Sequence, residues 1–170
     1  MKHIFLVALI IGLGILTRAQ SELEVSTDGT EKILKGLINR DMLEKDTAFK
    51  WFTENKAAYR PAAEDVALLR ARRQDLEFLV FGGTWNEETK YILPRFYSLV
   101  DAAAVSRDQV TLVGVDRYNR TVKNLSQDLR VNKIPTIIIL KKGQELGRVT
   151  EFGKDALWDR QLTTIIDTSH

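Results

Sequence analysis

The run Trp85-Asn86-Glu87-Glu88-Thr89 contains the side chains of this sequence that are best placed to do chemistry. Glu87 and Glu88 could form a general acid–base pair or bind a metal ion. Neighbouring residues of a helix point about 100° apart, however, so the two carboxylates do not converge on one atom. No histidine accompanies them, because the two histidines are His3 and His170. We therefore expect neither a carboxylate centre nor a metal site here.

Thiol chemistry is excluded by composition, because none of the 170 residues is a cysteine. Disulfide exchange needs a thiolate as nucleophile. The sequence also has neither a glycine-rich phosphate loop nor a G-x-S-x-G motif. It therefore indicates no catalytic residue and no cofactor, and we expect a protein that is not an enzyme. An unsuspected hydrolase stays open as an alternative.

Alternating strand and helix patterns occupy the chain from residue 76 onward. A short apolar run, Leu76–Phe81, ends at Gly82-Gly83 and predicts a buried strand. The β-branched run Thr136–Leu140 predicts another, and Lys141-Lys142-Gly143-Gln144 predicts a hairpin turn after it. The whole predicted order is strand 76–81, helix 87–104, strand 110–115, helix 121–129, strands 136–140 and 145–150, and helix 154–167. This β-α-β-α-β-β-α order predicts the α/β class, with a mixed four-stranded sheet covered by helices.

The preceding residues are predicted to be helical. Residues 20–27 are polar and are interpreted as a flexible lead-in. Between Asp28 and Asp46 the apolar residues recur at helical spacing, and Asp28 and Thr30 are candidate caps. A second helix would carry Trp51 and Phe52, and Pro61 would open a third. We therefore interpret residues 28–73 as a helical extension of a domain that spans residues 74–168.

The first residues have the features of a secretory signal peptide. Lys2 precedes the apolar run Ile4–Leu16, and Thr17-Arg18-Ala19 places small residues before a cleavage point after Ala19. An uncleaved membrane anchor is the alternative, but the run is shorter than the roughly 20 residues that a span needs. Without residues 1–19 the 25 basic residues fall to 23, which equals the number of acidic residues. We expect an exported, periplasmic protein that binds neither nucleic acid nor a membrane after cleavage.

Several motifs together resemble the thioredoxin superfamily over roughly residues 74–168. They are similar to an exported branch of thioredoxin family proteins that is typical of Bacteroidetes-like bacteria. The leader also resembles that branch in Trp51-Phe52 and Tyr59-Arg60-Pro61. The resemblance implies a thioredoxin fold. The motifs that carry it in the domain are Gly83-Thr84-Trp85, Pro94-Arg95-Phe96-Tyr97, Val115-Asp116-Arg117, Ile134-Pro135-Thr136 and the run from Gly143 to Glu151.

The sequence departs from this family at the active site. The resemblance assigns Asn86 to the position of the nucleophilic cysteine and Thr89 to that of the resolving cysteine. It also assigns Val80 to the position of a buried acid. Asn86 is a favourable N-cap, and Glu87 and Glu88 would stand in the first turn, where negative charge is stabilising. We expect the helix start to be kept while the chemistry is lost.

A peptide-binding groove could survive that loss. The resemblance implies that the Ile134–Pro135 bond is cis, which leaves backbone groups of Ile134 free to pair with an extended peptide. Trp85, Ile134 and Pro135 would line the groove. The alternative is that Pro135 only shapes the fold. Asp116 and Arg117, beside the same edge, are interpreted as an exposed ion pair.

Three functions are compatible with these observations. The first is a redox-inactive binding or accessory module of the cell envelope, whose partner is a protein or peptide. The second is a member of the thiol–disulfide oxidoreductases of cell redox homeostasis in which the catalytic cysteine is missing. The third is a structural module whose helical leader docks onto a larger assembly.

Overall fold

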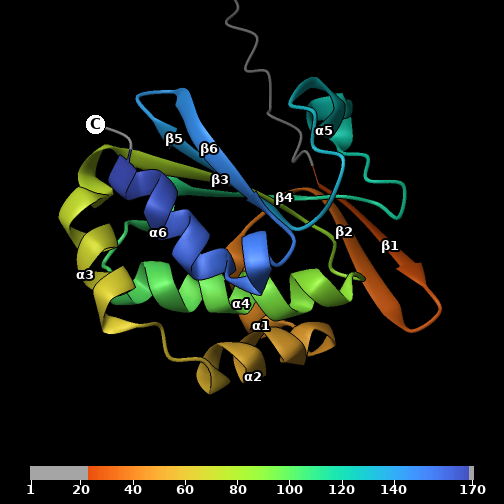
Figure 1. Cartoon of the computed structure of the whole chain (residues 1–170). Helices are drawn as coiled ribbons and strands as arrows, with labels where there is room; N and C mark the ends of the chain where they lie inside the picture. Colours follow the sequence, from red (N-terminus) through yellow and green to blue (C-terminus); the bar gives the residue numbers. More distant parts are fainter. Residues whose placement is uncertain (1–22, 169–170) are drawn as a thin grey trace, which may run out of the picture.

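A six-stranded mixed β-sheet forms the centre of the protein in the computed structural model, which describes residues 23–168 (Figure 1). The expected signal peptide, residues 1–19, and residues 20–22 lie outside the described residues. The strands are β1 (Leu23–Asp28), β2 (Glu31–Ile38), β3 (Leu76–Gly82), β4 (Val110–Gly114), β5 (Thr136–Lys141) and β6 (Gln144–Thr150). The helices are α1 (Arg40–Lys45), α2 (Lys50–Ala58), α3 (Ala63–Arg72), α4 (Glu87–Ala102), α5 (Leu125–Asp128) and α6 (Trp158–Thr168).

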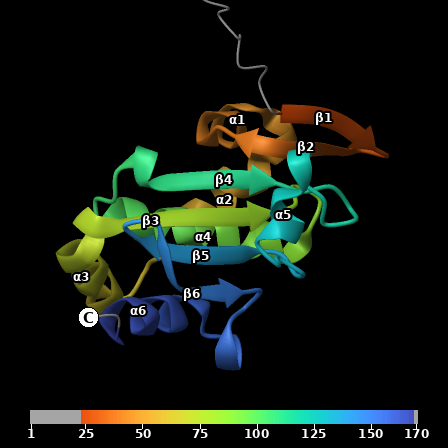
Figure 2. The same ribbon diagram turned by 90° about the horizontal axis from the view of Figure 1, so that it is seen from above.

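The strand order across the sheet is β1-β2-β4-β3-β5-β6 (Figure 2). Strands β3 and β4 are parallel, and every other neighbouring pair is antiparallel. From β3 onward the elements follow the predicted order, and the α/β class is confirmed. The predicted number of four strands is wrong, because β1 and β2 extend the sheet beyond β4.

A β-hairpin replaces the expected flexible lead-in and the first part of the expected helix. Strand β1 covers most of residues 20–27, and β2 covers Glu31–Ile38. Gly29 at the turn has φ +60°, and Gly36 inside β2 has φ +111°, neither of which a helix accepts. The pair Asp28-Gly29 is a hairpin signal, and β2 pairs with β4 through Gly36, Leu37 and Ile38. Helix α1 begins only at Arg40, after an Asn39 cap.

Helices cover both faces of the sheet. The larger core lies on the side of α4 and α6, and α2 packs against α4 from outside (Figures 1 and 2). The smaller core lies on the opposite side, beneath α5. Its buried members are Phe81, Val113, Val115, Val131, Ile134 and Ile138. Within residues 23–168, no helix has the length and apolar character needed to cross a membrane.

Gly114 allows β2 to lie close to the end of β4. A Cβ atom at this position would stand 2.1 Å from the backbone oxygen of Leu34, which is far inside contact distance. The obstacle is main chain, so no rotamer change can relieve it. The attachment of the hairpin to the sheet therefore depends on the missing side chain.

We predict that Gly114→Ala lowers the free energy of unfolding by about 1–3 kcal/mol or more, as overpacking does. Urea denaturation measures the change. Gly147→Ala is the matched control, because its Cβ would meet only the side chain of Ile165, at 3.0 Å. Equal losses from both substitutions would contradict the close approach of β2 and β4.

Candidate functional site

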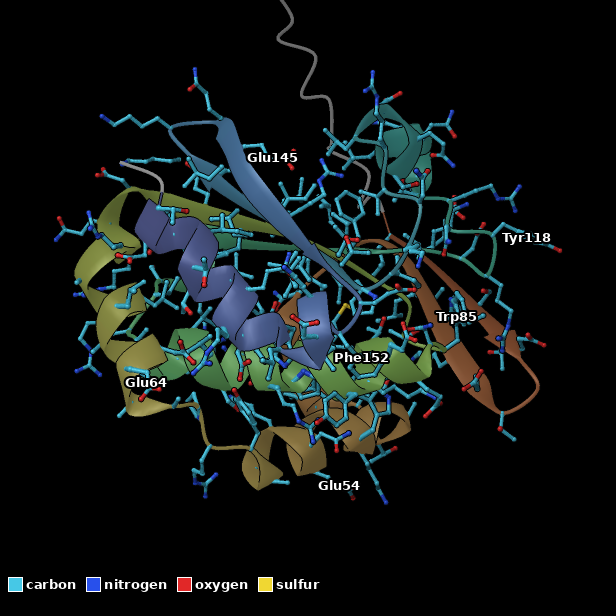
Figure 3. The ribbon with its side chains drawn as sticks, in the orientation of Figure 1. Glu54, Glu64, Trp85, Tyr118, Glu145 and Phe152 are labelled. Atoms are coloured by element: carbon cyan, nitrogen blue, oxygen red, sulfur yellow. The ribbon has the colours of Figure 1, made fainter. Side chains whose placement is uncertain are left out.

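The candidate site lies at the turn that joins β3 to α4, where Gly83 and Trp85 precede the helix (Figure 3). A Cβ atom on Gly83 would stand 2.7 Å from Trp85 Nε1 and 3.0 Å from Ile134 Cδ1. Trp85 and Ile134 are thus brought together around this glycine, as the sequence predicted. The Trp85 indole N–H donates to the backbone oxygen of Val115 at 3.2 Å, which fixes the ring.

Asn86 is the N-cap of α4, as predicted. Its side-chain oxygen accepts from the backbone N–H of Thr89 at 2.7 Å, and its backbone is extended. Glu87 and Glu88 occupy the first turn. An amide supplies no nucleophile here, so the position stabilises the helix start and cannot attack a disulfide.

Thr89 is buried and serves the turn. Its hydroxyl accepts from the backbone N–H of Gly83 at 3.2 Å, and its methyl group would stand 2.8 Å from a Cβ at Gly82. Only 1% of Thr89 is exposed. This side chain therefore holds the β3–α4 turn closed and does not face an incoming molecule.

The Ile134–Pro135 peptide bond is cis, as predicted. Pro135 is buried, and its carbonyl oxygen accepts from the backbone N–H of Glu151 at 2.7 Å. Among the described residues, by contrast, no hydrogen bond is formed by the backbone N–H or C=O of Ile134. The loop thus pairs the Pro135 carbonyl within the protein and leaves the N–H and C=O of Ile134 unpaired. These are the two backbone groups that an added strand would need.

A chain of ion pairs surrounds Trp85 on the side of the hairpin. The Arg117 guanidinium lies 5.1 Å from the centre of the Trp85 ring and contacts the carboxylates of Asp28 and Glu31. Glu31 also accepts from Lys90 at 2.9 Å. Lys90 holds the pKa of Glu31 below its usual value, and Arg117 adds to this effect. Charged residues from β2, α4 and the segment after β4 therefore frame the tryptophan.

Sequence reasoning missed this frame because it placed the hairpin residues in a helix. The expected ion pair between Asp116 and Arg117 is wrong, since Asp116 pairs with Arg120 at 3.0 Å and Arg117 turns towards the hairpin.

Thr84 was missed as well. Its hydroxyl donates to Lys32 O at 2.8 Å and accepts from Leu34 N at 3.2 Å, which ties the β3–α4 turn to β2. Only the Asp28-Gly29 turn signal could have indicated these contacts from the sequence.

Glu88 faces the opposite side of the turn, towards the loop that carries Pro135. Burial raises the pKa of Glu88, the nearby carboxylate of Glu151 raises it further, and Lys133 partly offsets both. Lys133 itself pairs with Glu151 at 2.8 Å. Within residues 23–168 Glu88 forms no ion pair, whereas Glu87 pairs with Lys90 at 2.6 Å. On this side of the site, therefore, the carboxylate of Glu88 is a charge without an ionic partner.

Residues 23–168 contain no group of acidic, histidine or cysteine side chains that could hold a metal ion.

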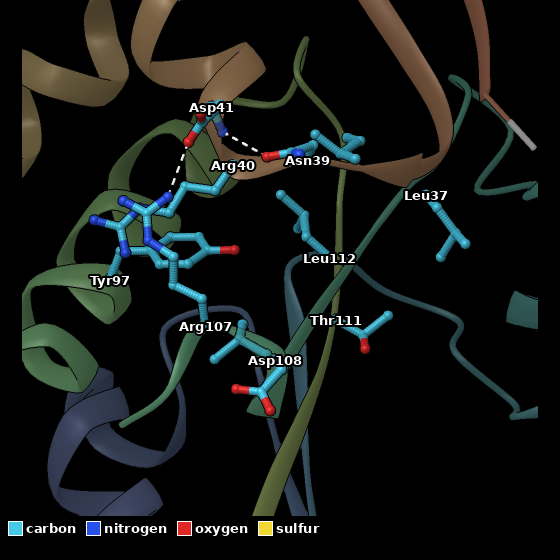
Figure 4. A pocket seen from close by; sticks show the side chains of 11 residues that line it. Leu37, Asn39, Arg40, Asp41, Tyr97, Arg107, Asp108, Thr111 and Leu112 are labelled. Atoms are coloured by element: carbon cyan, nitrogen blue, oxygen red, sulfur yellow. Dashed lines mark hydrogen bonds and ion pairs between the residues drawn. The ribbon is translucent and has the colours of Figure 1, made fainter. Parts of the chain in front are cut away.

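A separate cavity of about 600 Å³ lies at the other end of β4, at Val110 and Thr111 (Figure 4). Arg107 pairs with Asp41 at 2.9 Å and Arg40 pairs with Asp101 at 2.6 Å, whereas the Asp108 carboxylate accepts a hydrogen bond from the Ser106 hydroxyl and forms no ion pair within residues 23–168. The β3–α4 turn is the stronger candidate because it also presents the unpaired backbone groups of Ile134.

No protein-family model and no curated protein matches the chain. Among solved structures, the crystal structure of an HIV epitope-scaffold is similar, with a TM-score of 0.57 and 14% identity over 79% of this chain and 94% of that chain. A protein of unknown function from Pseudomonas aeruginosa gives a TM-score of 0.54 and 16% identity over the same shares of the two chains. The likeness is one of fold. At such identity it carries no information on activity.

The Asn86 cap leads to a prediction about stability. Asn86→Ala should lower the free energy of unfolding by about 0.5–2 kcal/mol, because the Thr89 N–H loses its acceptor. Asn86→Asp should cost much less, since a carboxylate caps equally well. Chemical denaturation of both variants measures this. An alanine variant as stable as the parent protein would show that the cap contributes nothing.

The environment of Glu88 leads to a prediction about pH. Because its folded-state pKa is raised, the folded chain releases the Glu88 proton less readily than the unfolded chain does. Stability is therefore lost as pH rises through the interval between the two pKa values. Glu88→Gln should make the protein more stable at pH 7 and leave it unchanged at pH 3. Urea denaturation at the two pH values tests this, with Glu87→Gln as a control that should bring no gain at pH 7. A Glu88→Gln variant that is less stable at pH 7 would contradict the described surroundings.

Proposed function

We propose that this protein is a redox-inactive, thioredoxin-like binding module of the cell envelope that holds an extended peptide segment of a partner protein. The peptide would add as a short strand beside Ile134, with Trp85 and Pro135 forming the walls. Export to the periplasm is part of the proposal and rests on the signal-like residues 1–19. The module would need no cofactor.

The observation that carries the proposal is the unpaired backbone of Ile134 beside the fixed ring of Trp85. Buried backbone groups are nearly always hydrogen-bonded, so an unpaired N–H and C=O at a loop point to a partner from outside. The cis Ile134–Pro135 bond and the β-α-β-α-β-β-α order from β3 onward support the thioredoxin-like assignment. The absence of cysteine removes exchange chemistry but leaves strand addition possible, because strand addition uses main-chain atoms.

Gly83 offers the sharpest test. Fluorescence anisotropy with labelled heptapeptides built on an extended Thr/Ala background should detect saturable binding. Gly83→Ala should weaken that binding at least tenfold, because the added Cβ displaces Trp85 and the Ile134 side chain.

Leu37→Ser is the matched control, since Leu37 is half exposed and lines the other cavity. It should leave the affinity unchanged. A thermal melt establishes that both variants are folded. A folded Gly83→Ala variant that binds as the parent does, or a Leu37→Ser variant that loses binding, would contradict the proposal.

A further inference from the structure

A ledge of two aromatic side chains continues the surface beside the proposed groove. Tyr91 of α4 is 45% exposed, and Phe152, in the turn after β6, is partly exposed. Their ring centres lie 5.5 Å apart at an angle of 58°. We call this pair the Tyr91–Phe152 ledge. Exposed aromatic rings that are held in place are typical of the energetically important parts of protein interfaces.

Neighbouring contacts hold both rings of the ledge. The Arg95 guanidinium lies 3.5 Å from the centre of the Tyr91 ring and donates to the Tyr91 backbone oxygen at 2.7 Å. Phe152 follows Glu151, whose backbone N–H is bonded to the Pro135 oxygen. The ledge is therefore tied to the same loop that presents Ile134.

Glu88 lies between the start of α4 and the ledge. Glu88 and Tyr91 are three residues apart in α4 and so project from the same side of the helix. The charges that act on Glu88 are those of Glu151 and Lys133, which pair with one another, so the negative charge of Glu88 itself is not neutralised. A basic side chain of a partner would find the complementary charge there.

We infer that the groove selects a peptide with a basic side chain opposite Glu88 and an apolar side chain two residues away, on the Tyr91–Phe152 ledge. This inference rests on the proposed function. An extended strand places alternate side chains on one face about 6.5–7 Å apart. The three residues from Glu88 to Tyr91 advance α4 by about 4.5 Å. The two peptide side chains are therefore spaced about 2 Å more widely than Glu88 and Tyr91, a difference that a long, flexible basic side chain can span.

The test uses heptapeptides with arginine, glutamine or glutamate at the third position and phenylalanine or serine at the fifth. The arginine and phenylalanine peptide should bind most tightly by anisotropy. Exchange of arginine for glutamine should weaken binding about three- to tenfold, and exchange for glutamate should weaken it more. Exchange of phenylalanine for serine should weaken it several-fold.

Substitutions in the protein test which of its side chains causes the preference for arginine and which causes the preference for phenylalanine. Glu88→Gln should abolish the distinction between the arginine and glutamine peptides, whereas Glu87→Gln, on the same turn but paired with Lys90, should keep it. Tyr91→Ser should reduce the distinction between the phenylalanine and serine peptides, and Phe152→Leu provides a second variant that keeps an apolar side chain in the turn.

The outcomes separate this inference from the proposed function. If all peptides bind equally and Gly83→Ala still weakens binding at least tenfold, the groove stands and its proposed selectivity is wrong. A preference for arginine that persists in Glu88→Gln would show that Glu88 is not the source of the preference, and would also overturn the inference. If no peptide of the set binds, the proposed function fails and the inference fails with it.

Discussion

The turn between β3 and α4 has no room for a Cβ atom at Gly82 or Gly83, and the arrangement of the site depends on that shortage of space. Thr89 fills the volume against Gly82, and Trp85 and Ile134 fill it against Gly83. Because the turn is this tight, its side chains have few other positions available. Close packing here fixes the direction of α4 and the place of the tryptophan at once.

The same turn shows how the start of α4 is stabilised by an asparagine and two glutamates. The Asn86 amide satisfies the Thr89 N–H, and the first-turn glutamates diverge. Glu87 forms an ion pair with Lys90, whereas Glu88 lies near Glu151 and Lys133, which pair with one another. A charge held without an ionic partner lowers stability, and functional sites often retain such groups. The asymmetry between two adjacent glutamates is therefore the chief electrostatic feature of the proposed groove.

The sequence predicted the elements whose signals are local. The apolar strand Leu76–Phe81, the β-branched run Thr136–Leu140 and the Asn86 cap each depend on neighbouring residues, and the structure confirms all three. The hairpin at residues 23–38 was missed because Ile33, Leu34, Leu37 and Ile38 also fit a helix, and only pairing with β4 decides between the two.

Contacts between distant segments could not be predicted for the same reason. Arg117 over Trp85, Thr84 against β2, and the Tyr91–Phe152 ledge each join segments that are separated in the chain by between about 30 and 60 residues. The register of the sheet and the path of the turn after β6 determine these contacts, and no local pattern encodes either of them.

The backbone amide of Ile134 reports most directly on the central claim that a peptide adds as a strand. Heteronuclear NMR on the labelled protein, titrated with the arginine and phenylalanine heptapeptide, follows this amide together with its rate of hydrogen exchange. The account predicts that saturation slows exchange of the Ile134 N–H markedly and shifts its signal downfield, as a new hydrogen bond requires. Saturable binding that leaves the Ile134 amide unchanged and shifts the amides of Val110 and Thr111 instead would place the ligand in the other cavity and contradict the account.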